Sequence, residues 1–382
     1  MNLRALLALP LAFLLAIPTL ALESPKNSAT SAILMDADSG RVLYEKNPNE
    51  KRLIASITKL MTALIAVETE DDLMIPVKIK KEWTQIEGSS LYLRAGETLS
   101  LKTLLYGLLL QSGNDAAVAI AGFCAGDVDT FVSEMNERAQ QIGMEHTHFA
   151  NPNGLNDPDH YSTAADMAKL ARVCIQNSNI ASVVATKSIS LEGRSFVNHN
   201  KLLWQYKDCI GMKTGFTQMA GRTLVSAAKR GDQTLIVVTL DDANDWNDHK
   251  TLFDYGFETY PQHLFCRAGK QLRRIPVEGS LIRSVPILLY EDIAYPMAES
   301  DKPTISLLLP ATVSAPIKEG TIAGQITCTL NGTIVADSYL IYGASAERSV
   351  ISGTYGIQKM LKLFRMREMT FTAAFQAIMM PS

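Results

Sequence analysis

Two strand-rich segments lie far apart in the chain, and the sequence between them is mostly helical in pattern. The first contains apolar residues 32–36 and 42–44 on either side of turn residues 37–41, which is typical of a β-hairpin. The second contains residues 222–228 and 234–240, joined by a polar turn with glycine, and predicts another antiparallel hairpin. Strands at both ends of a helical segment indicate an α+β domain whose antiparallel sheet brings those ends together.

Apolar residues recur at helical spacing between the two hairpins. A buried helix is predicted to begin near Ser56, because the apolar residues after it recur every three or four positions. Further helices are expected over residues 101–111, 115–123 and 131–142, and another is expected to start at residues 162–166, where a capping residue is present.

The chain changes character near residue 273. Short strand-like segments then alternate with Gly, Pro, Asp and Asn, which predicts a small all-β, sandwich-like domain over residues 273–345. The helical and strand-rich part before it, residues 22–272, forms the larger predicted domain.

The last segment, residues 346–382, combines apolar residues at helical spacing with lysines and arginines in its first half. This pattern predicts an amphipathic helix that lies on an anionic membrane surface and anchors the protein there. The alternative is a helix that docks on the protein's own surface.

Residues 1–21 have the features of a secretory signal peptide. A basic residue precedes an apolar run, and the small residues Thr19 and Ala21 have the spacing that a signal peptidase prefers. Pro10 and Pro18 argue against a retained membrane helix. We therefore expect cleavage after Ala21 and export to the outer face of the cytoplasmic membrane, the cell wall or the periplasm.

Composition excludes several classes of partner and cofactor. The 382 residues carry a formal net charge of -3, and outside the C-terminal segment no basic stretch with interleaved aromatic residues occurs, so no nucleic-acid partner is expected. His146 and His148 have no third ligand nearby in sequence and no H-E-x-x-H motif occurs, so neither a metal nor another cofactor is expected. The five cysteines are an odd number without a C-x-x-C pair, which predicts at least one thiol that is free or paired with another chain.

Three short motifs, far apart in sequence, supply the groups that acyl transfer to a serine needs. They are Ser56-Ile57-Thr58-Lys59, Ser112-Gly113-Asn114 and Lys213-Thr214-Gly215. Each motif alone is common in unrelated proteins. Their joint occurrence in this order indicates a serine-acylating site.

The first motif places a nucleophile beside a base. Ser56 and Lys59 are three residues apart in a predicted helix, so their side chains project from the same face. Burial in an apolar pocket, or the positive charge of Lys213, would lower the pKa of Lys59 and allow it to take the proton of Ser56. A second Ser-x-x-Lys sequence, Ser226 to Lys229, lies in a predicted strand, where such residues point to opposite faces, and is therefore excluded.

The other two motifs supply groups for proton relay and substrate binding. Ser112 offers a hydroxyl that can pass a proton to a leaving group, and Asn114 offers an amide that can donate to a substrate carbonyl. Lys213 and Thr214 offer a charge and a hydroxyl for an anionic group, and Gly215 allows substrate to approach the strand closely. The second motif is expected between two helices, and the third on a strand beside the second hairpin.

The three motifs resemble those of penicillin-recognising enzymes with an active-site serine. The chain is more closely similar to the low-molecular-mass penicillin-binding proteins that are D-alanyl-D-alanine carboxypeptidases, serine peptidase family S11. The similarity runs from about Ala29 to Phe257, and the β domain and terminal helix also resemble that family's layout. It implies a β-lactamase/DD-peptidase-like fold for the larger domain. The stretches that carry it are residues 54–63, 111–117, 148–155, 200–203 and 211–217.

This resemblance implies an enzyme that removes the terminal D-alanine from the stem pentapeptide of peptidoglycan. Ser56 would be acylated by the carbonyl of the penultimate D-alanine, with Lys59 as the general base. Ser112 would relay protons, and Asn114 would contact both the substrate and Lys59. The backbone N–H groups of Ser56 and Phe216 would form the oxyanion hole. β-Lactam antibiotics are expected as covalent inhibitors.

The resemblance also implies that Lys213, Thr214 and Thr217 receive the terminal carboxylate of the substrate. Many members of the family carry an arginine that helps to hold this carboxylate, but this chain has Asp245 at the aligned position. Carboxylate recognition would then fall on these three residues or on Arg222.

Three other functions stay open at this point. A class A β-lactamase needs a Glu-x-x-Leu-Asn stretch for fast deacylation, and none occurs in the chain. An endopeptidase that cleaves D-alanyl cross-links is disfavoured, but not excluded, by a clamp for a terminal carboxylate. A cell-wall binding protein that has lost catalysis would lack the nucleophile or the base, and here both are present.

Overall fold

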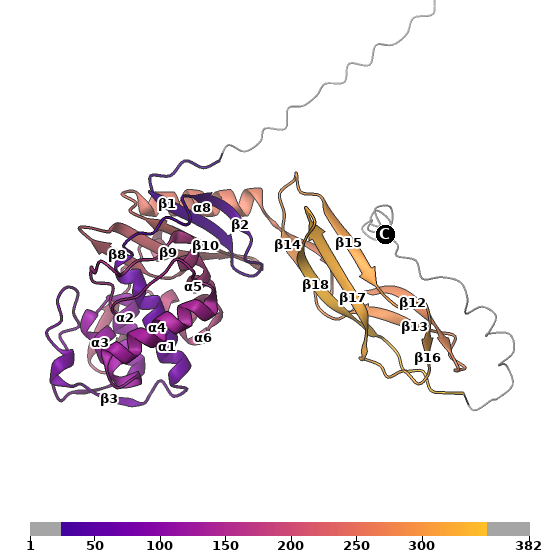
Figure 1. Ribbon diagram of the computed structural model, residues 1–382, viewed down its shortest axis with the longest axis horizontal. Helices are drawn as coiled ribbons and strands as arrows, with labels where there is room; N and C mark the ends of the chain where they lie inside the picture. The colour runs from indigo at the N-terminus through magenta and orange to yellow at the C-terminus, as the bar shows by residue number, and fades with distance from the viewer. Residues whose placement is uncertain (1–23, 350–382) are drawn as a thin grey trace, which may run out of the picture.

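The computed structural model describes residues 24–349, which form a mixed α/β domain followed by a β domain (Figure 1). The predicted signal peptide, residues 1–21, lies outside the described residues. So does most of the predicted C-terminal helix, since only residues 346–349 of that segment are described.

An antiparallel sheet forms the centre of the first domain, with the strand order β2-β1-β10-β9-β7 and with β8 also paired to β9. Its strands are β1 (Ser31–Asp36), β2 (Val42–Lys46), β7 (Cys209–Gly211), β8 (Thr214–Thr217), β9 (Gly221–Arg230) and β10 (Gln233–Leu240). Ser31 on β1 is paired with Leu240 on β10, and Asp36 with Leu235. The sheet therefore joins the two predicted hairpins, as the sequence pattern indicates.

Helices cover both faces of this sheet (Figure 1). On one face they are α1 (Lys59–Thr69), α2 (Leu101–Leu110), α3 (Asn114–Cys124), α4 (Val128–Ile142), α5 (Ala164–Gln176) and α6 (Ser178–Ala185). Helix α8 (Asp245–Thr259) packs on the other face through Leu252 and Phe253, which contact Leu235 and Val237 of β10 within one apolar cluster. Helix α1 is buried along almost its whole length, which explains why its pattern is apolar all round.

Short elements complete the first domain. They are the 3-10 helices η1 (Ala55–Thr58) and η2 (Lys81–Trp83), the strands β3 (Pro76–Lys78), β4 (Thr98–Ser100), β5 (Ser188–Leu191) and β6 (Arg194–Val197), and the one-turn helix α7 (Leu202–Gln205). Among residues 24–349, no single helix is long and apolar enough to cross a membrane, and one sharply bent pair, α3 with α4, meets the criterion by length and composition only.

The second domain contains only strands among its described elements. They are β11 (Gln262–Cys266), β12 (Gln271–Glu278), β13 (Ser284–Leu289), β14 (Ile293–Pro296), β15 (Pro303–Leu308), β16 (Val313–Ser314), β17 (Ile322–Leu330) and β18 (Thr333–Tyr342). Six of them form one sheet in the order β15-β17-β18-β13-β12-β16, and β11 pairs with β14.

The structure corrects both predicted boundaries of this domain. Phe265 and Cys266 of β11 belong to its apolar core, so the domain begins before residue 273. At the other end, Ala346 is buried and pairs with Ile317, so the domain extends into the segment predicted as a terminal helix. The periodicity of apolar residues did not reveal β11, because this strand begins only two residues after the end of α8.

One arginine of the first domain connects the two domains. Arg41 lies at the tip of the β1–β2 hairpin, and its guanidinium donates to the Pro296 carbonyl and to the Asp301 carboxylate, both at 2.7 Å. The same guanidinium lies over the rings of Tyr260 and Tyr295, at 5.0 and 5.4 Å from their centroids.

Candidate active site

The predicted nucleophile lies on the short 3-10 helix η1, directly before the buried helix α1. The hydroxyl of Thr223 on β9 donates to the Ile54 carbonyl at 2.9 Å, which fastens η1 to the sheet. Gly215 on β8 lies against the same turn, because a Cβ atom at this position would be 2.9 Å from the Ser56 nitrogen. The motif's glycine is therefore needed for the close approach of β8 to Ser56.

Lys59 lies at the centre of the site. Its Nζ atom is 2.8 Å from Ser56 Oγ, 2.7 Å from Asn114 Oδ1 and 2.5 Å from the Asn153 carbonyl oxygen. A neutral amine has two N–H donors and one lone pair, and the oxygens of Asn114 and Asn153 can only accept. These two acceptors take both N–H groups, so the lone pair is directed at the Ser56 hydroxyl, as a general base requires.

Two physical causes favour this neutral amine. Complete burial lowers the pKa of Lys59 well below its ordinary value, and the nearby charge of Lys213 lowers it further, while Asp115 opposes both effects. Burial and the charge of Lys213 are also the two causes named in the prediction that Lys59 acts as the base.

Ser112 and Asn114 lie at the break between α2 and α3, as predicted. The Asn114 amide nitrogen donates to the Glu87 carbonyl at 2.6 Å, which fixes Oδ1 toward Lys59. Ser112 has a φ of +63°, a conformation that non-glycine residues rarely adopt outside functional sites and turns. Its hydroxyl makes no hydrogen bond to any group within residues 24–349, so it is available to a substrate.

Lys213 immediately precedes β8 and is buried. Its backbone pairs with Val225 of β9 through two hydrogen bonds, and its Nζ donates to the Thr214 carbonyl at 2.8 Å. Desolvation lowers its pKa to about 7, so near neutral pH the side chain can still carry a positive charge for an anionic ligand.

The strand register sets the direction of the Phe216 amide. Residues 213 and 225 exchange both backbone hydrogen bonds, and such pairs alternate with non-bonded pairs along an antiparallel ladder. Phe216, paired with Arg222, is therefore in a non-bonded pair, and its N–H points away from β9. Within the described part of the chain, no strand pairs with that outer edge of β8, so the amide is free for an oxyanion.

Asp245 and Arg222 form a pair that sequence reasoning did not foresee. Arg222 Nε and Nη2 donate to the two carboxylate oxygens of Asp245 at 3.0 and 2.8 Å, and the guanidinium lies over the Trp246 ring at 5.4 Å. Asp245 belongs to the first turn of α8. The residue aligned with the family's arginine thus holds another arginine, which projects from β9 beside Phe216.

The hydroxyl of Thr217 is engaged within the protein. It donates to Asn156 Oδ1 at 2.9 Å and accepts from the Ala220 N–H at 3.0 Å. Among the residues predicted to bind the carboxylate, Arg222 keeps more free donors than Thr217, because no hydrogen bond within residues 24–349 uses its Nη1.

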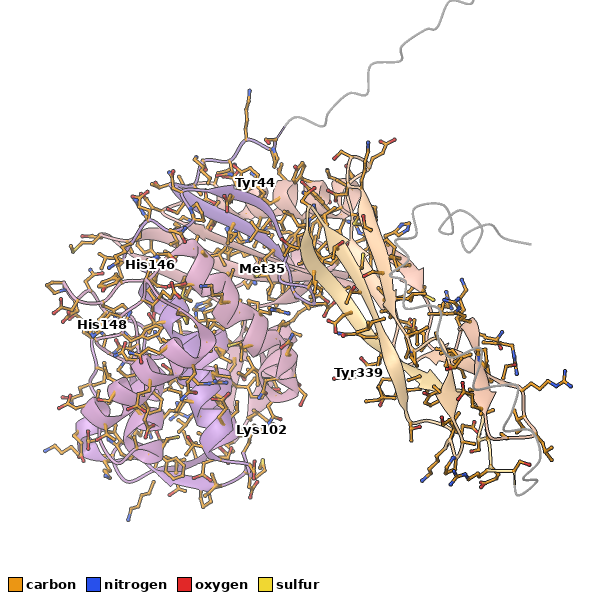
Figure 2. The ribbon with its side chains drawn as sticks, turned by 45° about the vertical axis from the view of Figure 1, so that its right-hand side comes forward. Met35, Tyr44, Lys102, His146, His148 and Tyr339 are labelled. Atoms are coloured by element: carbon orange, nitrogen blue, oxygen red, sulfur yellow. The ribbon has the colours of Figure 1, made fainter. Side chains whose placement is uncertain are left out.

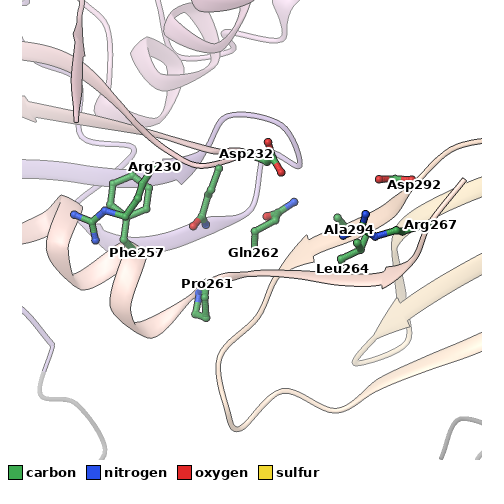
Figure 3. A pocket seen from close by; sticks show the side chains of 10 residues that line it. Arg230, Asp232, Phe257, Pro261, Gln262, Leu264, Arg267, Asp292 and Ala294 are labelled. Carbon is green, nitrogen blue, oxygen red and sulfur yellow. The ribbon is translucent and has the colours of Figure 1, made fainter. Parts of the chain in front are cut away.

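Other features are remote from this site. A cavity of about 600 Å³ lies at the junction of the two domains (Figure 3), where Arg230, Asp232, Arg267 and Asp292 contribute to its lining. None of the three motifs lines this cavity, so the serine-acylating site lies elsewhere.

The second Ser-x-x-Lys sequence does not form a serine–lysine pair. Ser226 is bonded to His249 on the α8 side of the sheet, away from Lys229. His146 and His148 lie on the part of the first domain away from the β domain (Figure 2). No cluster of three potential metal ligands occurs among residues 24–349, and all five cysteines are free thiols.

Sequence reasoning missed several supporting residues. Asp115 accepts hydrogen bonds from Ser90 and from the Leu91 and Leu93 N–H groups, which hold the loop over the start of α3. Asn153 contributes only a backbone oxygen, so its side-chain type could not reveal it. The family resemblance of residues 148–155 was the feature of the sequence that could have indicated Asn153.

Comparison with models of known protein families identifies the family to which the chain belongs. A model of the D-alanyl-D-alanine carboxypeptidase family, Peptidase S11, matches residues 19–244. A second model, penicillin-binding protein 5, C-terminal domain, matches residues 260–348. The chain belongs to peptidase family S11. It is a serine hydrolase with D-alanyl-D-alanine carboxypeptidase activity on peptidoglycan, as predicted.

Individual relatives are similar to this protein over most of its length. It is 32% identical to the D-alanyl-D-alanine carboxypeptidase DacF of Bacillus subtilis over 330 residues, which are 82% of this chain and 84% of the relative. It is 31% identical to DacC of Escherichia coli over 350 residues, 87% of each protein. The crystal structure of penicillin-binding protein 5 from Haemophilus influenzae has a TM-score of 0.70 at 28% identity and covers 85% of this chain. The predicted penicillin-binding fold with a second β domain is thereby confirmed.

Proposed function

We propose that Ser56 forms the acyl-enzyme and that Lys59 is its general base. The observation that carries this proposal is the position of Lys59 Nζ between two obligate acceptors and the Ser56 hydroxyl. In the first step, Ser56 Oγ gives its proton to Lys59 and attacks the carbonyl carbon of the penultimate D-alanine of a stem pentapeptide. The resulting oxyanion accepts hydrogen bonds from the N–H groups of Ser56 and Phe216.

The second part of the reaction releases the terminal D-alanine and restores the enzyme. The proton on Lys59 passes to the leaving amine, with Ser112 as the relay, and the carbon–nitrogen bond breaks. Water then gives a proton to Lys59 and attacks the ester carbonyl. The bond between the acyl carbon and Ser56 Oγ breaks, Ser56 Oγ takes the proton back from Lys59, and the shortened peptide leaves with a new carboxyl group. Asn114 donates to the substrate and keeps Lys59 in place.

We assign the terminal carboxylate of the substrate to Lys213, Thr214 and Arg222. The guanidinium of Arg222 is pre-oriented by Asp245 and by the Trp246 ring, and planar guanidinium groups suit carboxylates. Gly215 leaves room for the peptide beside β8. Thr217 acts mainly through the turn that it stabilises with Asn156.

β-Lactam antibiotics acylate the same serine, as expected for a penicillin-binding family. The residues assigned to the carboxylate support a carboxypeptidase over an endopeptidase, because the terminal D-alanine of a stem pentapeptide always presents a free carboxylate at this position. The intact nucleophile and base speak against a catalytically silent cell-wall binding protein. The absence of the class A Glu-x-x-Leu-Asn stretch from the sequence still speaks against a β-lactamase.

The enzyme works outside the cytoplasm, where peptidoglycan lies. We propose that the signal peptide of residues 1–21 directs its export, and that residues 346–382 hold it on the outer face of the cytoplasmic membrane. The supporting observation is that the terminal segment combines apolar residues at helical spacing with lysines and arginines in its first half. Deletion of residues 350–382 should move the protein from the membrane fraction to the soluble fraction, and its persistence with membranes would refute the anchor.

The assignment of the substrate carboxylate to Lys213, Thr214 and Arg222 is tested with two substrates. We expect wild-type protein to release D-alanine from a stem pentapeptide faster than it cleaves a D-alanyl cross-linked dimer. Arg222→Ala should raise the KM for the pentapeptide about tenfold or more. Arg230→Ala removes an arginine at the other end of β9, which pairs with Asp208, and should leave KM unchanged. Faster cleavage of the dimer than of the pentapeptide would instead support the endopeptidase.

A further inference from the structure

The residue before the nucleophile has an unusual backbone conformation. Ala55 is buried and has a φ of +49°, a left-handed conformation that residues with a Cβ atom rarely adopt unless the surroundings hold it. The peptide between Ala55 and Ser56 is planar, so its carbonyl and its N–H point in opposite directions. Whatever fixes the Ala55 carbonyl therefore also fixes the direction of the Ser56 N–H.

Two groups hold this carbonyl. The Thr58 hydroxyl lies 2.8 Å from the Ala55 oxygen and also 2.8 Å from His160 Nε2. Gly154 lies against the same carbonyl, where an added Cβ would come within 2.0 Å of the oxygen. Both His160 and Gly154 come from the loop whose Asn153 carbonyl binds Lys59.

The direction of each hydrogen bond follows from the donors available. The Ala150 N–H donates to His160 Nδ1 at 3.1 Å, so Nδ1 carries a lone pair and the neutral ring has its proton on Nε2. That Nε2–H donates to Thr58 Oγ1, which leaves the Thr58 proton for the Ala55 carbonyl. The buried ring stays neutral because desolvation lowers the pKa of His160 to about 4.

We propose that His160 and Thr58 form a relay of hydrogen bonds that positions the Ser56 N–H for the oxyanion. Neither side chain touches the reacting atoms, so both are positioning residues. The relay starts at a backbone N–H of the loop, passes through the imidazole and the hydroxyl, and ends on the carbonyl of the peptide that carries the Ser56 amide. In the first turn of η1 this amide has no intrahelical acceptor, and Gly215 of β8 lies beside it.

This inference rests on the proposed role of Ser56. It goes further because it assigns a function to the middle of the Ser-x-x-Lys motif, where Thr58 separates the nucleophile from the base. It also gives His160, in the loop of residues 149–161, a role that requires no proton transfer.

The test measures acylation of the full chain by a fluorescent penicillin over a range of concentrations. Thr58→Val removes the hydroxyl with little change in shape, and we expect the maximal acylation rate constant to fall about tenfold or more, with the half-saturating concentration little changed. Thr58→Ser keeps the hydroxyl and should restore most of the rate. His160→Leu should slow acylation to a similar extent, and adding it to Thr58→Val should cause little further loss, because both act through one carbonyl.

The chain offers a matched control. Thr239 on β10 makes an equivalent buried hydrogen bond, 2.9 Å from its hydroxyl to His249 Nε2, on the α8 side of the sheet. Thr239→Val should lower the midpoint of thermal unfolding without lowering the maximal acylation rate.

Two results would overturn the relay: a folded Thr58→Val protein that acylates at the wild-type maximal rate, or a Thr58→Ser protein as slow as Thr58→Val. If His160→Leu does not fold, the two Thr58 variants decide the question. Labelling that persists in Ser56→Ala would contradict the assignment of the nucleophile instead, so the two failures are distinguishable.

Discussion

At the scale of single residues, two buried lysines have opposite tasks. Lys59 must be neutral to accept the Ser56 proton, and Lys213 must be charged to attract a carboxylate. Burial lowers the pKa of both, and the charge on Lys213 lowers the pKa of Lys59 further. The proposed mechanism requires that Lys59 loses its proton before Lys213 as the pH rises, so that a pH range exists in which each lysine has the form that it needs.

This order predicts a bell-shaped dependence of kcat/KM on pH. Activity should rise as Lys59 is deprotonated and fall above about pH 7, where Lys213 loses its charge. Steady-state release of D-alanine measured from about pH 5 to about pH 9 tests the shape. In Lys213→Arg the guanidinium stays charged, so the alkaline fall should move to higher pH or vanish even if the absolute rate is lower. An alkaline limb unchanged in that variant would show that another group causes it.

At the scale of elements, the fold around the nucleophile depends on a loop that has no regular structure. The loop of residues 149–161 lies against η1 and α1, where it binds Lys59 through the Asn153 carbonyl, Thr62 through the Pro152 carbonyl and Thr58 through His160. Its glycine, Gly154, has a φ of +83° and no room for a side chain.

Gly154→Ala should therefore lower both stability and acylation. The added methyl group would meet the Ala55 carbonyl, and the left-handed backbone adds strain, so we expect a loss of about 3 kcal/mol or more in the free energy of unfolding. Gly143→Ala is the control, because Gly143 has a similar φ of +79° but no atom within 4 Å of an added Cβ, and it should cost only about 1–2 kcal/mol. Urea denaturation of both variants compares the two losses, and equal losses would contradict the close contact.

Local patterns in the sequence predicted helices α1 to α5 and the strands β1, β2, β8, β9 and β10, but not α6, α8 or the short strands β3 to β7. The hairpins β1–β2 and β9–β10 and the break between α2 and α3 each follow from neighbouring residues. The pair of Arg222 with Asp245 and the contact of Gly154 with Ala55 could not be predicted, because they join residues from separate elements whose approach only the folded sheet determines. The same limit applies to the start of the β domain, since only its packed core shows that Phe265 belongs to it.

At the scale of the whole molecule, Arg41 connects the two domains. Its guanidinium donates to the Pro296 carbonyl and to the Asp301 carboxylate, and it lies over the ring of Tyr295 in the second domain and that of Tyr260 at the end of α8. Burial alone would raise the pKa of Asp301, but the Arg41 guanidinium and the Ala298 N–H hold it below its ordinary value. The carboxylate is thus ionised and binds Arg41 at neutral pH.

Arg41→Ala should weaken the coupling between the domains by about 1.5–3 kcal/mol without affecting acylation. Small-angle X-ray scattering should show a wider range of molecular dimensions, while the rate of penicillin labelling stays at the wild-type value. Arg138→Ala removes an ion pair with Glu68 inside the first domain and should not change the scattering. Unchanged scattering of Arg41→Ala would mean that other contacts fix the domains.

The central claim is that Ser56 carries the acyl group. Intact-protein mass spectrometry after brief exposure to a penicillin tests it most directly. Wild-type protein should gain the mass of one penicillin molecule, with the adduct on the peptide that contains Ser56, and Ser56→Ala should gain none. An adduct of equal yield in Ser56→Ala, or an adduct located on another residue of the wild-type protein, would contradict the account.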